Sequence, residues 1–327
     1  MSLHTIAQQL VATGKGILAA DESSGTIKKR FASINTESAP ENNRLYRQML
    51  FTAPGVEKYI SGVILFDETI RQQAEDGRSL PLVLSERGII PGIKVDLGTE
   101  LFPGSEIEKF TKGLEGLDER LKEYVNFGAK FAKWRAVFII SESTPSEMCI
   151  DRNAGDLAEY AFICQQNSLV PIVEPEVLMD GDHTIEKCFE VTKKVLQAVF
   201  AKLKDRGIDL SGILLKPNMV LPGEKIAKAA PEQIAEFTLK CLSEAVPAGV
   251  PGIVFLSGGQ TEDEACANLN AMNATGDKYP WELSFSFGRA LQNSALKTWA
   301  GKPENVESAQ RVFLERCRKA GEARRNK

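Results

Sequence analysis

Histidine is almost absent from this sequence of 327 residues, which contains only His4 and His183. Two histidines cannot build a three-histidine zinc site, and no Ser-His-Asp triad is evident. His183 lies in the loop-like sequence DGDHT, where we expect a solvated side chain. Chemistry in this chain is therefore expected to use Lys, Asp, Glu and Arg side chains, without a metal or another cofactor.

Cysteine is also sparse. The six cysteines form no C-x-x-C pair, and the two closest, Cys149 and Cys164, are well separated in the sequence. This spacing gives no metal-binding or redox motif. Small buried thiols in a reducing compartment are the preferred interpretation.

Long apolar runs and an excess of one charge are missing as well. No run approaches the ~18 residues of a membrane span, and the N-terminal sequence MSLHTIAQQL lacks the cationic and apolar regions of a secretory signal. Lys and Arg number 40 against 44 Asp and Glu, which gives a net charge of −4. We therefore expect a cytoplasmic protein that binds neither nucleic acid nor a membrane.

Apolar runs recur eight times, with helix-like segments between them. Most of the runs are too apolar to have one solvated face, which is typical of buried parallel strands. The alternation predicts an α/β fold, a (β/α)8 TIM barrel in a single domain over residues 1–327, with a short N-terminal helical segment and a C-terminal helix. The predicted strands are 15–21, 60–67, 89–95, 128–138, 169–177, 211–217, 251–257 and 281–287.

Three of the intervening segments have clear helical features. Residues 184–204 place apolar side chains at i, i+3 and i+4 spacing, and so do residues 306–320. A third helix is expected to begin at Pro231, because proline suits the first turn of a helix.

Charged residues stand at or just beyond the ends of the predicted strands. Lys and Glu rarely end a buried strand, and the carboxyl ends of barrel strands share the rim where such enzymes have their active sites. We therefore expect an active site built from these charges, with no set of metal ligands. The residues are Asp21, Lys94, Lys133, Arg135, Glu174, Glu176, Lys216 and Arg289.

Lys216 ends the apolar run GILLK. A lysine in a barrel mouth can hold an anion, or its neutral amine can attack a carbonyl and form a Schiff base. At pH 7 an ordinary lysine is neutral in only about one molecule in 2,500, and burial or a neighbouring cation raises that share. We expect Lys216 to be the Schiff-base lysine and Lys133, two strands away, to be the neighbouring cation.

Schiff-base chemistry also needs proton donors and acceptors. Glu174, Glu176 and Asp21 are the well-placed carboxylates. Each of them alone is more often a structural ion pair with a lysine. Their joint occurrence at strand ends favours a catalytic role.

Glycine-containing loops after the last two predicted strands indicate a phosphate site. FLSGGQT follows the seventh strand and SFGRAL the eighth, where barrels commonly bind phosphate through backbone N–H groups. A glycine pair alone is more often a turn. A second basic set, Lys28, Lys29 and Arg30 with Lys94, could hold another anion or could equally be a solvated helix turn.

The motifs GILAADES, KWR, VPIVEPE, LLKPNM, FLSGGQ and FSFGRAL closely resemble those of the class I fructose-1,6-bisphosphate aldolases, in the family's order from residue 16 to residue 291. The resemblance implies a metal-independent aldolase of glycolysis and gluconeogenesis. Such an enzyme cleaves a phosphorylated sugar, fructose 1,6-bisphosphate, reversibly to dihydroxyacetone phosphate and glyceraldehyde 3-phosphate through a lysine Schiff base. It also implies a TIM barrel that assembles as a homotetramer.

The resemblance implies residue roles as well. Lys216 would form the Schiff base, Glu174 with Glu176 beside it would serve carbinolamine chemistry, and Asp21 would handle the substrate C4 hydroxyl. Lys133 and Arg135 would line the site. The implied substrate-binding residues are Ser257, Gly258, Ser286, Gly288 and Arg289 at the dihydroxyacetone phosphate half, and Ser23, Thr26, Lys29, Arg30 and Lys94 at the other phosphate.

Two departures from the family pattern concern Thr26 and the tyrosines. Thr26 stands where many members have serine, and it keeps the hydroxyl. Many members also use a tyrosine of a C-terminal tail to protonate the enamine intermediate. The last tyrosine here is Tyr279, so we expect a water or an internal carboxylate to take that part.

A scaffold or binding protein that kept the barrel but lost turnover is the alternative from another functional class. Such a protein need not keep Asp21, Lys133, Glu174 and Lys216 together, so their joint presence favours the enzyme. An assay for triose phosphate release distinguishes the two.

Overall fold

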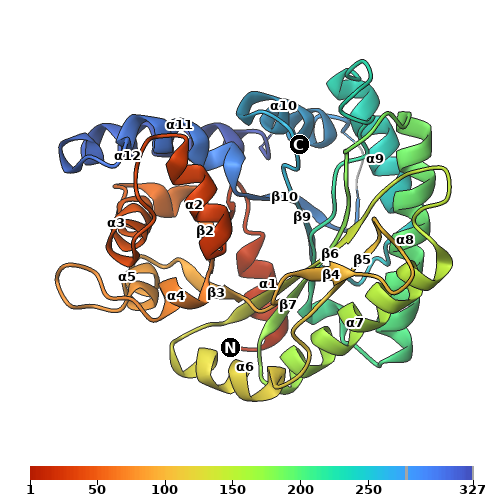
Figure 1. Cartoon of the computed structure of the whole chain (residues 1–327), viewed down its shortest axis with the longest axis horizontal. Coiled ribbons are helices and arrows are strands. Elements are labelled where there is room, and N and C mark those ends of the chain that lie inside the picture. The colour runs from red at the N-terminus through yellow and green to blue at the C-terminus, as the bar shows by residue number, and fades with distance from the viewer. Residues whose placement is uncertain (277–278, 326–327) are drawn as a thin grey trace.

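Eight parallel strands close into a barrel in the computed structural model, which describes residues 1–276 and 279–325 (Figure 1). The strands follow the order β1-β10-β9-β8-β7-β6-β3-β2 around the ring, and β2 pairs with β1 to close it. Each strand falls within its predicted range, so the TIM barrel predicted from the sequence is confirmed. The barrel strands are β1 (Gly16–Ala20), β2 (Ile60–Leu65), β3 (Ile90–Lys94), β6 (Phe131–Phe138), β7 (Val170–Val177), β8 (Leu214–Leu215), β9 (Gly252–Phe255) and β10 (Glu282–Phe287).

Helices cover the outer face of the ring, which explains why the strands carry apolar residues on both faces (Figure 1). No helix within the described ranges is long and apolar enough to cross a membrane. The α-helices after the first are α2 (Ser24–Ala32), α3 (Pro40–Phe51), α4 (Asp67–Ile70), α5 (Leu80–Glu86), α6 (Leu117–Asn126), α7 (Glu147–Gln166), α8 (Ile185–Asp205), α9 (Pro231–Ala245), α10 (Glu262–Asn273), α11 (Arg289–Trp299) and α12 (Val306–Glu322), with 3-10 turns η1 (Val56–Lys58), η2 (Leu210–Gly212) and η3 (Pro303–Asn305).

The first helix, α1 (Leu3–Leu10), covers the end of the barrel where the strands begin. It can lie close because β9 begins with a glycine and β2 has a glycine near its start. A Cβ on Gly62 would lie 2.5 Å from Leu10, and one on Gly252 would lie 2.6 Å from Val11. The N-terminal end of the barrel is therefore closed by apolar packing, which leaves the C-terminal end for a site.

A short antiparallel hairpin, β4 (Thr99–Leu101) and β5 (Lys109–Thr111), lies outside the barrel and was not predicted. All three residues of β4 are exposed, so the segment has no buried apolar face to signal a strand. The hairpin fills the connection between β3 and α6 without changing the order of the barrel.

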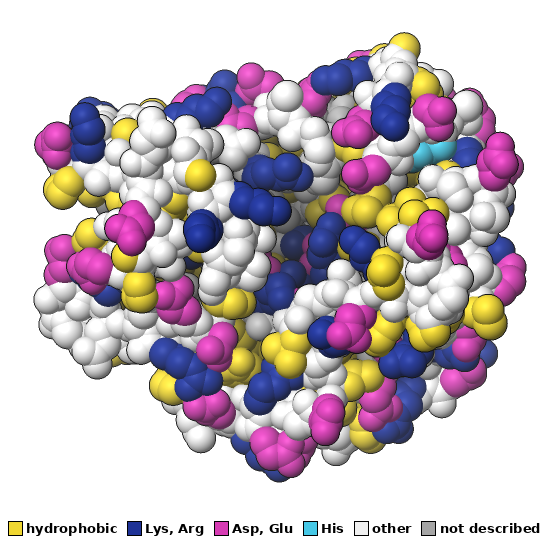
Figure 2. All heavy atoms as spheres, viewed as in Figure 1, with side chains coloured by type: hydrophobic (Ala, Val, Ile, Leu, Met, Phe, Trp, Pro, Cys, Tyr) yellow, Lys and Arg dark blue, Asp and Glu magenta, His cyan; other side chains and the backbone are white. Residues whose placement is uncertain are grey.

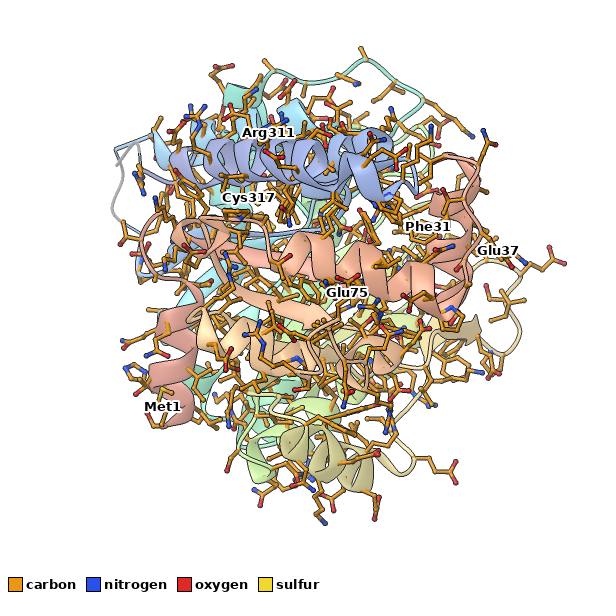
Figure 3. All side chains as sticks on the ribbon, turned by 90° about the vertical axis from the view of Figure 1, so that its left-hand side faces the viewer. Met1, Phe31, Glu37, Glu75, Arg311 and Cys317 are labelled. Carbon is orange, nitrogen blue, oxygen red and sulfur yellow. The ribbon has the colours of Figure 1, made fainter. Side chains whose placement is uncertain are left out.

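The last helix, α12, packs against α11 and α3 on the outside of the barrel (Figure 3). Beyond it, the buried side chain of Arg324 donates hydrogen bonds to the backbone carbonyls of Val11 and Leu283 at 3.0 Å and of Ala12 at 2.6 Å. Burial lowers the pKa of Arg324 to about 10, against the opposite effect of Glu282. Arg324 thus joins the end of α12 to the loop after α1 and to β10.

Candidate active site

Four charged side chains from different strands meet inside the C-terminal end of the barrel. Asp21 follows β1, Lys133 belongs to β6, Glu174 belongs to β7, and Lys216 follows β8. Figure 2 shows a hollow in the middle of the molecule in which Lys and Arg side chains gather. The parallel strands bring these groups together because their carboxyl ends share one rim.

Glu174 bridges two lysines. Its Oε1 lies 3.0 Å from Nζ of Lys216, and its Oε2 lies 3.3 Å from Nζ of Lys133. Nζ of Lys133 also lies 2.7 Å from Oδ2 of Asp21 and 4.0 Å from Oδ2 of Asp96. The side chains of Glu174 and both lysines are at most 5% exposed, so water screens these charges little.

The charges of this cluster fix two protonation states. Burial alone would raise the pKa of Asp21, but the ammonium groups of Lys133 and Lys216 lower it to about 2. Burial alone would lower the pKa of Lys133, but Asp21, Glu174 and Asp96 raise it above its ordinary value. At neutral pH, Asp21 is therefore a carboxylate and Lys133 an ammonium.

Lys133, which the sequence analysis expected as the cation near Lys216, contacts the same carboxylate as Lys216. Three carboxylates, Asp21, Glu174 and Asp96, lie around its ammonium. The group closest to the Lys216 amine is the Glu174 carboxylate. Glu174 is therefore the group placed to accept or donate a proton at the Lys216 amine.

Arg135 and Glu176 form a second ion pair on the neighbouring strands β6 and β7. Burial opposes the charge of Arg135, but Glu176 raises the pKa of Arg135 above its ordinary value. Glu176 also faces the loop after β9, because a Cβ on Gly258 would lie 3.1 Å from its Oε1. The same Cβ would lie 2.8 Å from Leu256, so a side chain at this position would crowd both neighbours.

The two loops expected to bind phosphate are neighbours. β9 pairs with β10, so Ser257 and residues 286–288 leave the barrel side by side. Ser257 and Ser286 are buried, and the Ser286 hydroxyl has no hydrogen-bond partner among the described residues. Gly288 precedes α11, whose first residue is the exposed Arg289. A free hydroxyl, an arginine and the open N–H groups of a helix start together suit a phosphate group.

The residues expected at the other phosphate lie in two places. The side-chain oxygens of Ser23 and Thr26 are 3.2 Å apart at the start of α2, and Lys29 on the same helix is exposed. Lys94 at the end of β3 donates to the carboxylate and the backbone carbonyl of Asp96, at 2.5 and 2.6 Å. The two hydroxyls and Lys29 are open to an anion, whereas Lys94 already has a carboxylate partner.

Arg30 differs from the rest of this basic set because its side chain is only 10% exposed. It is paired with Glu22 and donates at 3.3 Å to Gln292 and to Asn293 of α11. Glu22 also lies 2.8 Å from the buried Arg47 of α3. Arg30 therefore links α2 to α11 through hydrogen bonds. Because it is already paired with Glu22, it is less available to an anion than Lys29.

Asp96 and the Glu22–Arg47 pair are site residues that the sequence analysis missed. Asp96 is buried and follows β3 in the sequence KVDLG, so the strand-end rule that selected Lys94 could have found it. The Glu22–Arg47 contact has no sequence signal, because it joins a helix to the loop after β1.

His183 is buried at 8% exposure, so the expectation of a solvated loop residue is wrong. The loop after β7 folds onto the segment after β8 through backbone hydrogen bonds, including one of 2.8 Å from Gly223 N–H to the His183 carbonyl. This covers the imidazole ring, and burial lowers the pKa of His183.

The barrel mouth thus combines a lysine amine, carboxylates and two anion-binding regions. No group of three or more His, Cys, Asp or Glu side chains in residues 1–276 and 279–325 is arranged to hold a metal ion. Lys216 can bond to a carbonyl carbon, and Glu174 can move protons at that bond. The anion-binding regions can fix a substrate that carries a negative group at each end.

Comparison with known proteins shows similarity over nearly the whole chain. The family model of class-I fructose-bisphosphate aldolases matches residues 2–327. Fructose-bisphosphate aldolase 6, cytosolic, of Arabidopsis thaliana is 57% identical over 95% of this chain and 87% of that protein. Fructose-bisphosphate aldolase, cytoplasmic isozyme 1, of Pisum sativum is 54% identical over 97% of this chain and 89% of that protein. A solved structure of fructose-bisphosphate aldolase from Plasmodium falciparum, in complex with TRAP and a small-molecule inhibitor, has a TM-score of 0.97 at 52% identity, covering 99% of this chain and 94% of that one.

Proposed function

The chain belongs to the class-I fructose-bisphosphate aldolase family, and from this membership we propose how the residues of its barrel mouth carry out the reaction. The reaction is the reversible cleavage of fructose 1,6-bisphosphate to dihydroxyacetone phosphate and glyceraldehyde 3-phosphate, a step of glycolysis. A lysine Schiff base is typical of the family. The plant relatives are named as cytosolic or cytoplasmic enzymes, which agrees with the location predicted from the sequence.

Lys216 forms the covalent bond to the substrate. Its ammonium first gives a proton to Glu174, whose Oε1 lies 3.0 Å away, and the neutral amine attacks the C2 carbonyl. Glu174 then returns a proton to the carbinolamine hydroxyl, which leaves as water, and an iminium at C2 remains. A positioned acid/base of this kind contributes typically ~10² to 10⁴ in rate.

Asp21 accepts the proton of the C4 hydroxyl as the C3–C4 bond breaks. The bonding pair moves toward the iminium nitrogen of Lys216, which produces an enamine and releases glyceraldehyde 3-phosphate. The Asp21 carboxylate is ionised at neutral pH, and Lys133 holds it in place at 2.7 Å. Protonation of the enamine at C3 and hydrolysis of the imine then release dihydroxyacetone phosphate.

The two phosphate groups orient the sugar between the amine and the carboxylates. Ser257, Gly258, Ser286 and the start of α11 at Arg289 bind the phosphate of the dihydroxyacetone half. The first turns of α2 bind the other phosphate through the Ser23 and Thr26 hydroxyls and Lys29. Arg30 and Lys94 support this end through their pairs with Glu22 and Asp96.

The observation that carries this proposal is the Glu174 carboxylate placed between Lys216 and Lys133. Borohydride with dihydroxyacetone phosphate should reduce the imine and label Lys216 in a peptide map. Lys216→Arg should abolish label and turnover, whereas Lys130→Arg, at an exposed lysine just before β6, should keep both. Label on another lysine, or loss of turnover with a chelator that metal restores, would show the mechanism to be wrong.

We also propose that the chain assembles as a homotetramer, as the family resemblance implies. Sedimentation velocity at micromolar concentration should give one species of four chains. A single species of one or two chains would contradict this assembly.

A further inference from the structure

The hydrogen-bond ladder between β7 and β8 is interrupted at the level of the catalytic residues. The N–H of Lys216 donates to the carbonyl of Val173 at 2.8 Å, just beyond the two residues of β8. In the parallel register that pairs Val173 with Leu215, the next bond would run from the N–H of residue 175 to the carbonyl of Lys216. Residue 175 is proline, which has no N–H, so this bond cannot form.

A second proline weakens the other side of β8. The register Leu215↔Ile253 would direct the N–H of residue 217 toward β9, but residue 217 is also proline. One bond remains there, from the N–H of Leu256 to the carbonyl of Pro217 at 3.1 Å. Lys216 therefore lies where the ladder on each side of β8 lacks one donor, at Pro175 of β7 on one side and at Pro217 on the other.

The side chain of Asn218 replaces the missing pairing to β7. The N–H of Val177, which a continued ladder would direct to the backbone carbonyl of residue 218, donates instead to Oδ1 of Asn218 at 2.9 Å. Nδ2 of Asn218 donates to the carbonyl of Met219 at 3.0 Å and to Oγ1 of Thr192 in α8 at 3.2 Å. Asn218 and Thr192 are 4% and 3% exposed, so these bonds are shielded from solvent.

We propose that Asn218 is a positioning residue, which fixes Lys216 against Glu174 by joining the end of β8 to the end of β7. β7 is held on its other side by continuous pairing with β6, from Phe131↔Val170 to Phe138↔Val177. Lys216 has no such pairing beyond its own N–H, so its 3.0 Å contact with Glu174 depends on Asn218. The inference rests on the proposed roles of Lys216 and Glu174.

Two variants test the role of Asn218 in turnover. A displacement of about 1 Å costs on the order of 10²-fold in rate, so Asn218→Ala should lower kcat and the rate of borohydride-trappable imine formation by about that factor. KM for fructose 1,6-bisphosphate should change little, because the phosphate-binding groups are untouched. Thr192→Val keeps the Val177 bond and removes one acceptor of the Asn218 amide, so it should lower kcat by about 5-fold.

Asn273→Ala is the matched control. Asn273 is 5% exposed, and its side-chain amide donates to the carbonyl of Leu269 in α10 at 3.0 Å. The substitution therefore removes a buried asparagine bond outside the barrel strands. It should lower the unfolding temperature while leaving kcat unchanged.

The outcomes separate a positioning role from a structural one. Full kcat and normal imine trapping in both site variants would overturn the inference, as would an equal loss of kcat in Asn273→Ala. If Asn218→Ala does not fold, Thr192→Val decides, since a lower kcat at constant KM supports the role and an unchanged kcat overturns it. Failure of the proposed function looks different, because the unchanged protein would then carry the label on a residue other than Lys216.

Discussion

The ammonium of Lys133 and the carboxylate of Asp21 lie 2.7 Å apart across the barrel, although β2 and β3 separate β1 from β6 around the ring. Glu174 and Asp96 face the same ammonium at 3.3 and 4.0 Å. Three carboxylates thus surround one buried cation, and two of them, Glu174 and Asp96, have a second lysine partner in Lys216 and Lys94. Removing that cation tests the electrostatics of the whole barrel mouth.

Lys133→Met keeps an unbranched side chain but leaves the carboxylates around it without their shared partner. Removing one partner of a buried ion pair typically destabilises a protein by about 3–5 kcal/mol. Urea unfolding at pH 7 should show a loss of this size. Lys130→Met changes an exposed lysine on the same chain segment and should change the stability little. Equal stability of the two variants would contradict the central place of Lys133.

The loss of stability in Lys133→Met should depend on pH in a direction that the pKa of Asp21 defines. The pKa of Asp21 in the folded protein, about 2, lies below its ordinary value of 3.8. Ionised Asp21 therefore stabilises the folded state above about pH 4, and the contribution is lost as the pH falls toward 2. In Lys133→Met the pKa of Asp21 in the folded protein should rise, because burial raises this pKa and the ammonium of Lys133 no longer lowers it. The difference in unfolding free energy between the two proteins should then narrow from pH 7 to pH 4, and a constant difference would count against the assignment.

Glu174→Gln keeps the shape of the side chain and removes its ability to accept and return a proton. We expect kcat to fall by about 10² to 10⁴ with little change in KM, because a positioned acid/base contributes about that much to rate. Steady-state kinetics with fructose 1,6-bisphosphate measures both constants. Glu236→Gln on the exposed face of α9 is the control and should behave like the unchanged protein. Near-full kcat in Glu174→Gln would remove Glu174 from the mechanism.

Arg289→Ala should act mainly on substrate binding. Arg289 opens α11 beside the phosphate loop, and a hydrogen bond to a charged group contributes about 1.5–3 kcal/mol. KM should therefore rise by about 10- to 100-fold while kcat changes less. Lys297→Ala, an exposed position on the same helix, should leave KM unchanged. A fall in kcat at constant KM would point to a different role for Arg289.

Glu22→Gln removes the negative charge that pairs with both Arg30 of α2 and Arg47 of α3. Because α2 carries residues assigned to the second phosphate, KM for fructose 1,6-bisphosphate should rise by about 10-fold. KM for fructose 1-phosphate, which lacks that phosphate, should stay nearly constant. Glu41→Gln, in an exposed pair with Arg44, is the control. Equal changes for both substrates would show that α2 does not discriminate between them.

The fold was largely predictable because burial on both faces marks parallel strands in the sequence. The range 211–217 was predicted as a strand, yet only Leu214–Leu215 are regular, since Pro217 interrupts the pairing that would extend it. The hairpin of β4 and β5 was not predicted, because little in its sequence marks it as a pair of strands. All of β4 is exposed, and β5, although half-buried to buried, is too short for its burial to show as a pattern in the sequence.

The residues that form the site were easier to predict than the ion pairs between them. Strand ends must share one rim, so the charged residues at those ends were bound to gather there. Which carboxylate faces which lysine depends on side-chain distances across the barrel, so the contacts of Lys133 with Asp21 and Glu174 could not be predicted. The bond from Val177 to Asn218 was equally invisible, because it depends on the register of two strands.

The bonds of Arg324 to the carbonyls of Val11, Ala12 and Lys15 join segments that are synthesised far apart in time. Ribosomes add about 5–20 residues per second, so the roughly 300 residues from β1 to Arg324 require about 15–60 seconds. Until β10 is synthesised, late in that interval, the apolar edge of β1 that pairs with β10 in the finished barrel has no partner. The first strand therefore has an unpaired edge for most of the synthesis of the chain, and such an edge can pair with another chain.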